Sequence, residues 1–366
     1  MLQYLDQYGM LFIASLSATA LFTPSFSWVA SMQNIVDSPG LHKTHGEAKP
    51  LLGGLAIFAG ILLTLAIFTP ISDRMMSILI AACVLVITGL LDDVNNLKPL
   101  AKLSGQIIAA SVVVLSNVEN FGLFLDLFER FYLPGNLALF FLIGWIVLMV
   151  NAFNLIDGLD GLAAGSAAII FAGMALITIL NGGSHSIVGL QIIGFGACAG
   201  FLIFNFNPAR IFMGDTGSML LGFLLAVTFL FSLNGNFNSS MVLGSIFIFA
   251  YPALDTGFAI LRRLKNRTPI FQADKKHIHH ILITLGYSVR KTVLVIYLAN
   301  FFFACLAVIL LSMHLTSSAL ILIWALTVIF TFILLKTLYA FSRSMKCCST
   351  GCSVCNTNPL EEDHSS

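Results

Sequence analysis

Residues 137–163 read "LALFFLIGWIVLMVNAFNLIDGLDGLA" and join an apolar run to a row of polar residues. The apolar part, residues 137–150, is long enough to form most of a helix across the hydrocarbon core of a bilayer. Asn151, Asn154, Asp157 and Asp160 follow at intervals of three residues. Such residues are costly beside lipid, so a membrane helix that leads into this stripe indicates a functional site.

The rest of the chain repeats the apolar pattern. Of its 366 residues, 58% are hydrophobic and only 10% are charged. The alternation expected of a membrane β-barrel is missing, so helices must satisfy the backbone in lipid. The sequence therefore predicts an all-α polytopic membrane protein, a bundle of about eleven transmembrane helices. The expected spans are 10–30, 52–70, 75–91, 101–117, 137–152, 161–180, 188–206, 218–233, 241–260, 292–312 and 318–339.

The basic residues predict the orientation of these spans. Sixteen of the 18 Lys and Arg residues fall in the odd-numbered connections or at the C-terminal end, while the even-numbered connections carry only Arg74 and Arg130. Cytoplasmic loops of membrane proteins are rich in Lys and Arg. We expect the N-terminus outside and the C-terminus in the cytoplasm. The net charge of +1 gives no indication of a nucleic-acid partner, and none is expected.

The domain organisation is simple. We expect one transmembrane domain, residues 1–340, that holds the active site, followed by a cytoplasmic Cys-containing and acidic tail, residues 341–366. The tail contains Cys347, Cys348, Cys352 and Cys355. A metal cluster and acylation beside the membrane are alternatives, but free thiols are the default on the reducing side of the membrane.

Carboxylates gather on the predicted cytoplasmic face, since four connections bring them there. The residues concerned are Asp92, Asp93, Asp157, Asp160, Asp215 and Asp274, with Asp255 near the end of the ninth span. Carboxylates packed together repel one another unless a divalent cation neutralises them, and oxygen ligands suit Mg²⁺ or Mn²⁺. Caps of helix ends are the alternative explanation for single residues of this set.

The segment "DKKHIHH", residues 274–280, lies on the same face. Lys275, Lys276, His277, His279 and His280 supply donors suited to phosphate oxygens. Carboxylates, a cation and a basic segment are the parts of a phosphoryl-transfer site, and a membrane setting suggests a lipid phosphate as one substrate. A solvated basic loop and a zinc site are the alternatives for this segment, although the usual zinc-ligand spacing is absent.

Two other classes of protein remain open at this point. An ion-coupled transporter also uses acidic residues, but it places them near the middle of the bilayer on broken helices. A Mg²⁺ channel or a non-catalytic scaffold would explain a ring of carboxylates, but not the His/Lys segment that faces it.

Four motifs in fixed order carry a resemblance to a known family. They are "LLDDVNNLKPLAKLSGQ", "NAFNLIDGLDGLA", "RIFMGDTGSMLLGF" and "DKKHIHHILITLGYS". Together they resemble the polyprenyl-phosphate N-acetylhexosamine-1-phosphate transferases, over about residues 30 to 290. The resemblance implies a bundle of ten or eleven transmembrane helices with an active site on the cytoplasmic face.

The resemblance also implies a reaction and a set of roles. Undecaprenyl phosphate would attack the β-phosphorus of a UDP-N-acetylhexosamine, with Mg²⁺ or Mn²⁺ required and UMP released. Asp215 would bind the metal, with Asp93 as a second ligand. The groups acting in catalysis would be Asp92, Asp93, Asp157, Asp160 and His279. The substrate-binding groups would be Asn154, Phe212, Lys49, Lys275, His277 and His280.

The partners follow from the same resemblance. "HIHH" after "ADKK" resembles the enzymes that use UDP-N-acetylglucosamine, and Lys49 in "HGEAKPLLGG" differs from the segment of the pentapeptide-transferring relatives. We expect UDP-N-acetylglucosamine as donor, undecaprenyl phosphate as acceptor and a place in the bacterial inner membrane. The pathway would be a cell-surface polysaccharide such as O-antigen or teichoic acid. A homodimer is left open.

Overall fold

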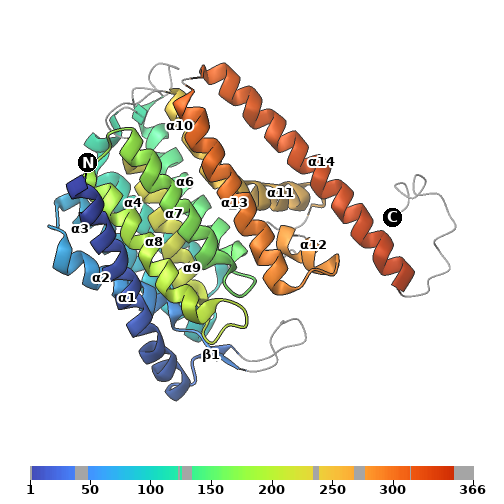
Figure 1. Cartoon of the computed structure of the whole chain (residues 1–366), viewed down its shortest axis with the longest axis horizontal. Coiled ribbons are helices and arrows are strands. Elements are labelled where there is room, and N and C mark those ends of the chain that lie inside the picture. The colour runs from blue at the N-terminus through green and yellow to red at the C-terminus, as the bar shows by residue number, and fades with distance from the viewer. Residues whose placement is uncertain are drawn as a thin grey trace.

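The computed structural model describes residues 2–37, 48–122, 124–125, 134–233, 239–267, 277–313 and 315–349. Nearly all of them are helical (Figure 1). The α-helices are α1 (Leu2–Met32), α2 (Gly53–Phe68), α3 (Asp73–Asn95), α4 (Pro99–Ser116), α6 (Gly135–Ile156), α7 (Leu162–Leu180), α8 (His185–Asn205), α9 (Gly214–Ser232), α10 (Ser239–Ser245), α11 (Ala250–Lys265), α12 (Ile278–Thr284), α13 (Val289–Ser312) and α14 (Ser317–Ser349).

The all-α, multi-span architecture expected from the sequence is confirmed. Ten helices in the described ranges are long and apolar enough to cross a membrane. The predicted span 52–70 corresponds to α2, which has only 16 residues and is therefore about 24 Å long. That is shorter than a typical hydrocarbon core.

Three short features were not predicted. The ninth predicted span, 241–260, is divided into α10, the 3₁₀ helix η2 (Ile246–Phe249) and α11. Pro252 lies in the first turn of α11, where its missing N–H removes no helical hydrogen bond. The strands β1 (Val36–Asp37) and β2 (Lys49–Pro50) form an antiparallel pair, and part of the predicted basic connection folds as α12.

Local sequence explains several helix starts. The side chain of Ser72 accepts a hydrogen bond from the Met75 N–H at the start of α3, and Ser288 does the same for Lys291 at the start of α13. Pro99 occupies the first position of α4, where its fixed φ angle favours a helix.

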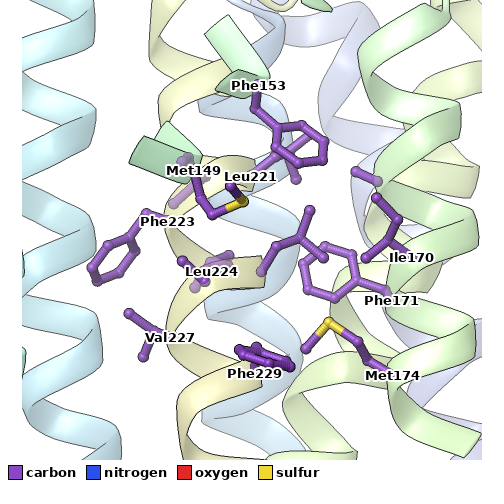
Figure 2. Packing of buried hydrophobic residues seen from close by; sticks show 14 of the residues in the cluster. Met149, Phe153, Ile170, Phe171, Met174, Leu221, Phe223, Leu224, Val227 and Phe229 are labelled. Carbon is purple, nitrogen blue, oxygen red and sulfur yellow. The ribbon is translucent and has the colours of Figure 1, made fainter. Parts of the chain in front are cut away.

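Helix α9 is the centre of the bundle. It contacts α2, α3, α6, α7 and α8, and its residues from Thr216 to Ser232 are buried. Figure 2 shows Met149 and Phe153 of α6, together with Phe171 of α7, packed around Leu221 and Leu224 of α9. Because it is enclosed by other helices, α9 holds its first turn in a fixed place.

Helix α14 lies at the outer edge of the bundle, beyond α13 (Figure 1). In the most apolar stretch of its segment Ser317–Leu338, only 6% of the residues are buried inside the protein. A helix that is apolar but uncovered by protein suits direct contact with lipid.

Candidate active site

A polar cavity of about 380 Å³ opens where the ends of several helices meet. It is lined by the end of α3, the segment after α6, the segment before α9, the start of α9, and α12. Six aspartates, one histidine and one phenylalanine are among the lining residues: Asp37, Asp92, Asp93, Asp157, Asp160, Asp215, His280 and Phe212. Carboxylates gathered around one cavity repel one another, and bound cations would reduce that repulsion.

Asp93 is held by the first turn of α9. Its Oδ1 accepts a hydrogen bond from the Asp215 N–H at 2.7 Å, and its Oδ2 accepts from the Thr216 N–H at 3.1 Å and the Thr216 hydroxyl at 2.7 Å. These N–H groups have no partner inside α9, and a carboxylate at a helix N-terminus stabilises it. Asp93 therefore fixes where Asp215 stands.

Glycines allow this close approach. Gly214 has a φ angle of +67°, and a Cβ there would meet Asp93 Oδ2 at 2.6 Å. A Cβ on Gly54 of α2 would lie 2.2 Å from the Gly217 nitrogen, and one on Gly89 of α3 would lie 2.5 Å from the Thr216 Cα. Backbone thus packs on backbone around the start of α9, which only glycine permits.

Lys102 of α4 joins three of the polar groups. Its ammonium donates to Asp92 Oδ2 at 2.8 Å, to Asp215 Oδ2, and at 3.4 Å to Asn154 Oδ1. Asn154 in turn donates to Asp215 Oδ1 at 2.7 Å. Residues from α3, α4, α6 and α9 therefore form one network around Asp215.

Lys102 was not among the site residues expected from the sequence. Its signal was available, because Lys102 is the one charged residue in α4. An ionisable group within an apolar helix is by default a functional candidate.

Asp157 is a cavity carboxylate whose side chain accepts no hydrogen bond from the described part of the chain. Burial and then the charges of Asp215, Asp93 and Asp160 raise the pKa of Asp157 well above 3.8. This carboxylate is therefore suited to take up a proton or a metal ion.

Asp160 and Lys49 hold the segment that precedes α9. Asp160 Oδ2 accepts from the Asn207 side chain at 2.8 Å and from the Ala209 N–H at 2.9 Å. Lys49 donates to the Ala209 carbonyl at 2.6 Å. The backbone of Phe212 pairs with Pro50 and Gly53, and Phe212 is one of the residues that line the cavity.

The three predicted histidines lie in different surroundings. His277 Nδ1 is 2.8 Å from Asp255 Oδ2 of α11, and both side chains are buried. His279 is 1% exposed, and its Nε2 faces Gly158, where a Cβ would lie 2.7 Å away. His280 alone of the three lines the cavity. Lys275 lies outside the described residues.

His279 is neutral in the folded protein. Burial, and secondarily the neighbouring His280, lower its pKa to about 3. Its ring lies 4.3 Å, centre to centre, from that of His280. His279 therefore supports His280 and Gly158 as an uncharged group.

A second cavity, of about 540 Å³, adjoins the first and shares Asp92 with it. One face each of α4, α6 and α11 forms most of its walls, and most of its lining surface is apolar. Lys102, Asn154 and Arg263 lie on these walls at the polar end, while Gly144 lies about 15 Å further along α6 than Asn154. An elongated molecule with a charged head and an apolar chain would fit such a space.

The residues present fit a divalent cation. Within the described ranges, no three His, Cys, Asp or Glu side chains form a ready-made metal cage. Mg²⁺ needs none, because it keeps several waters and is commonly held by one or two carboxylates together with substrate phosphates. Asp157 and Asp215, which border one cavity, have suitable chemistry for that purpose. Asp93, the second ligand expected from the sequence, instead accepts hydrogen bonds at both oxygens from the first turn of α9.

The chain is similar in sequence to known proteins. Residues 75–233 match the family model described as glycosyl transferase family 4. The chain is 40% identical over 310 residues to the probable undecaprenyl-phosphate N-acetylglucosaminyl 1-phosphate transferase of Bacillus subtilis (strain 168), with 82% of this chain and 84% of that protein covered.

Two further relatives have the same kind of name. The decaprenyl-phosphate N-acetylglucosaminephosphotransferase of Mycobacterium tuberculosis (strain ATCC 25618 / H37Rv) is 34% identical, with 74% of each chain covered. The undecaprenyl-phosphate alpha-N-acetylglucosaminyl 1-phosphate transferase of Escherichia coli (strain K12) is 27% identical, with 89% of this chain and 90% of that protein covered. The chain therefore belongs to the family of the polyprenyl-phosphate N-acetylhexosamine-1-phosphate transferases and is an enzyme of the sugar-phosphate transferase class.

Proposed function

We propose that the enzyme transfers N-acetylglucosamine 1-phosphate from UDP-N-acetylglucosamine to undecaprenyl phosphate, with UMP as the second product. One observation carries this proposal: an acidic cavity and an apolar cavity meet at Asp92, beside the network of Lys102, Asn154 and Asp215. The names of the relatives suggest the lipid acceptor and the sugar phosphate that is transferred, and the UDP carrier is our proposal.

The acidic cavity is the proposed donor site. Asp157 and Asp215 would hold Mg²⁺ or Mn²⁺ there, and that cation, when bound, would neutralise diphosphate oxygens and polarise the β-phosphoryl group. Phe212 offers an aromatic face to the uracil ring, and His280 a donor to the diphosphate or the sugar. Lys275 remains a predicted diphosphate contact.

The apolar cavity is the proposed acceptor site. Lys102 and Arg263 lie on opposite walls of its polar end, on α4 and α11, and supply positive charge for the phosphate. Leu103, Val147 and Leu148 offer an apolar surface to the prenyl chain. Leu148 is 39% exposed, and we propose that the prenyl chain passes beside it into the bilayer.

The reaction is a direct displacement. An oxygen of the lipid phosphate forms a bond to the β-phosphorus, and the bond from that phosphorus to the bridging oxygen breaks, so that UMP leaves with that oxygen. A phosphomonoester has a second pKa of about 6 and is already mostly dianionic at neutral pH. Asp92 therefore positions Lys102 beside the acceptor and need not act as a base.

Several of the predicted residues act by positioning others. Asp93 fixes the first turn of α9, and Asp160 with Lys49 fixes the segment before it. His277 is tied to Asp255, and the Ile278 N–H donates to the same carboxylate at 2.8 Å, so the start of α12 is held in place. His279 supports His280 from inside the protein.

The site faces the cytoplasm of a bacterium, and the enzyme lies in the inner membrane. Support comes from the bias of 16 basic residues against two across the membrane and from the bacterial relatives. UDP-sugars are made in the cytoplasm, so a site on that face meets a soluble donor and a lipid acceptor together.

The test is product release by the purified full chain with undecaprenyl phosphate and Mg²⁺. UDP-N-acetylglucosamine, UDP-N-acetylgalactosamine and UDP-muramoyl-pentapeptide are supplied in separate reactions. Metal-dependent release of UMP with the first donor alone is the expected result. Release of UMP with another donor would overturn the sugar assignment, and release of UDP would overturn the reaction.

Asp157 gives a pH dependence that needs no activity assay. Its pKa is raised in the folded state, so between pH 3.8 and that raised pKa the folded protein binds more protons than the unfolded chain. With a chelator present, the free energy of unfolding therefore falls as the pH rises through this range. Mg²⁺ should raise the thermal unfolding temperature more at pH 8 than at pH 5. Asp157→Asn should reduce this difference, and an unchanged difference would exclude Asp157 as a cation ligand.

Gly144 tests the path of the prenyl chain. It lines the apolar cavity, and a Cβ there meets nothing within 4 Å, so Gly144→Phe should fold and fill the space. The KM for undecaprenyl phosphate should rise about 10-fold or more, because a few buried CH₂ groups lose their contacts. The KM for the UDP-sugar should not change.

Gly257→Phe is the control for this substitution. Gly257 also lies in open space within a helix, α11, but does not line the cavity. If both variants raise the KM for the lipid equally, or if neither does, the chain follows another path.

A further inference from the structure

The network around Asp215 has a second layer one helical turn further along the same three helices. Lys102, Asn154 and Asp215 meet in the first layer. Steps of four, three and four residues along α4, α6 and α9 lead to the second layer, since residues so spaced share one helix face. The residues of this layer are Gln106, Asn151 and Met219.

The second layer is joined by a reciprocal pair of amides. Asn151 Nδ2 donates to Gln106 Oε1 at 2.6 Å, and Gln106 Nε2 approaches Asn151 Oδ1 at 3.4 Å. Asn151 Nδ2 also donates to the Val147 carbonyl at 2.8 Å, which fixes the side chain against its own helix. Gln106 Nε2 lies 3.5 Å from the Met219 sulfur of α9.

Burying a pair of amides costs desolvation free energy, which suggests that the pair serves a function. Gln106 is 1% exposed, and a buried amide must find a hydrogen-bond partner. A pair of leucines would pack α4 on α6 without that requirement. An amide pair adds direction, because it tolerates little rotation or sliding of one helix on the other.

The two layers are only one helical turn apart, so the orientation that the amide pair imposes on α4 also affects the first layer. Lys102 is one turn from Gln106 on α4, and Asn154 is one turn from Asn151 on α6. A rotation of α4 that broke the amide pair would also carry the Lys102 ammonium away from Asp215. At a reacting centre, a displacement of about 1 Å can cost about 10²-fold in rate.

We propose that Gln106 and Asn151 are positioning residues of the transfer reaction. Their amide pair sets the rotation of α4 against α6 and so holds Lys102 between Asp92, Asn154 and Asp215. The inference rests on the proposed function, because it takes the network around Asp215 to be the reacting centre. Both amides also border the apolar cavity, so contact with the acceptor lipid is the rival role.

The experiment compares three variants of the full chain. Asn151→Leu breaks the pair, Gln106→Leu with Asn151→Leu replaces it by apolar packing, and Gln106→Asn with Asn151→Gln exchanges the two amides. The expected result is a kcat lowered about 10- to 100-fold in the first two, with both KM values within about 2-fold of wild type. The exchanged pair should recover kcat to within about 3-fold.

Thermal unfolding separates positioning from stability. The double leucine variant should unfold at or above the wild-type temperature and still turn over slowly. Wild-type kcat in that variant would overturn the proposal, since packing alone would then suffice. A raised KM for the lipid with an unchanged kcat would also overturn it, in favour of acceptor contact.

A substrate-free readout keeps this inference distinct from the proposed reaction. The rate at which an amine-reactive acetylating reagent labels Lys102 is followed by peptide mass spectrometry. In wild type, the contacts of Lys102 with Asp92 and Asp215 should slow this labelling. Asn151→Leu should raise the labelling rate at least about 3-fold. In the variant with the two amides exchanged, the rate should return to the wild-type value. Equal rates of Lys102 labelling in all variants would contradict the positioning role, whether or not wild type releases UMP.

Discussion

Replacing Asp215 by Asn is expected to lower kcat by about 10³-fold or more while the protein still folds and inserts. Asp215 stands at the centre of the network, half-buried, where Asn154 donates to one oxygen and Lys102 to the other. Asn keeps the size of the side chain but removes its charge, so it weakens the hold on both the ammonium and a divalent cation. Losing one such electrostatic contact at a reacting centre costs about 10²–10³-fold, and here two are lost together.

Asp73→Asn is the matched control for this substitution. Asp73 also lies in the first turn of a membrane helix, α3, but at the opposite end of that helix from Asp92 and Asp93. It should retain wild-type turnover. The measurement is kcat for UMP release at saturating Mg²⁺. Turnover by Asp215→Asn within about 10-fold of wild type would remove Asp215 from the reacting centre.

Lys102→Met should be the second most damaging substitution. It leaves the Asp92 and Asp215 carboxylates, both partly buried, without their shared cation, and it removes positive charge from the polar end of the acceptor cavity. We expect kcat to fall about 10²–10³-fold and the KM for undecaprenyl phosphate to rise about 10-fold. The KM for the UDP-sugar should change far less.

The control is Lys98→Met, one turn earlier at the start of α4. Lys98 is exposed and makes no side-chain cap hydrogen bond. If the two lysine variants behave alike, the effect is one of general surface charge. If Lys102→Met raises the KM for the UDP-sugar instead of the lipid, Lys102 belongs to the donor site.

The long elements of this fold could be predicted because each is encoded locally. A continuous apolar run forms a helix in lipid wherever it occurs, and the observed bounds of α7 and α4 differ from the expected spans by one or two residues. The break of the ninth span was not predictable in this way. Residues 241–260 are apolar throughout most of their length, and only packing decides where the chain bends.

Most of the aspartates that line the acidic cavity could be picked out as candidates from the sequence, but not the contacts that each of them makes. Asp92 and Asp93 are neighbours in the sequence, yet Asp92 pairs with Lys102 while Asp93 holds the first turn of α9. The contact of Asp93 with Asp215 joins residues 122 positions apart. No local pattern carries such a pairing, because it depends on which helix ends the packed bundle brings together.

The histidines make the same point about burial. "HIHH" predicted three similar donors, and the structure buries His277 and His279 and leaves His280 at the cavity. A seven-residue helix, α12, produces that difference, since it turns successive side chains toward different surroundings. Periodicity in so short a segment was too weak a signal to predict its helix.

The central claim is that the sugar is transferred together with its phosphate. The most direct measurement uses UDP-N-acetylglucosamine with radioactive phosphorus at the β-position, undecaprenyl phosphate, Mg²⁺ and the purified full chain. Transfer of the sugar 1-phosphate moves the label into the lipid and leaves UMP unlabelled, which is the result we predict. Label that stays in the water-soluble fraction as UDP, while the sugar enters the lipid, would contradict the account.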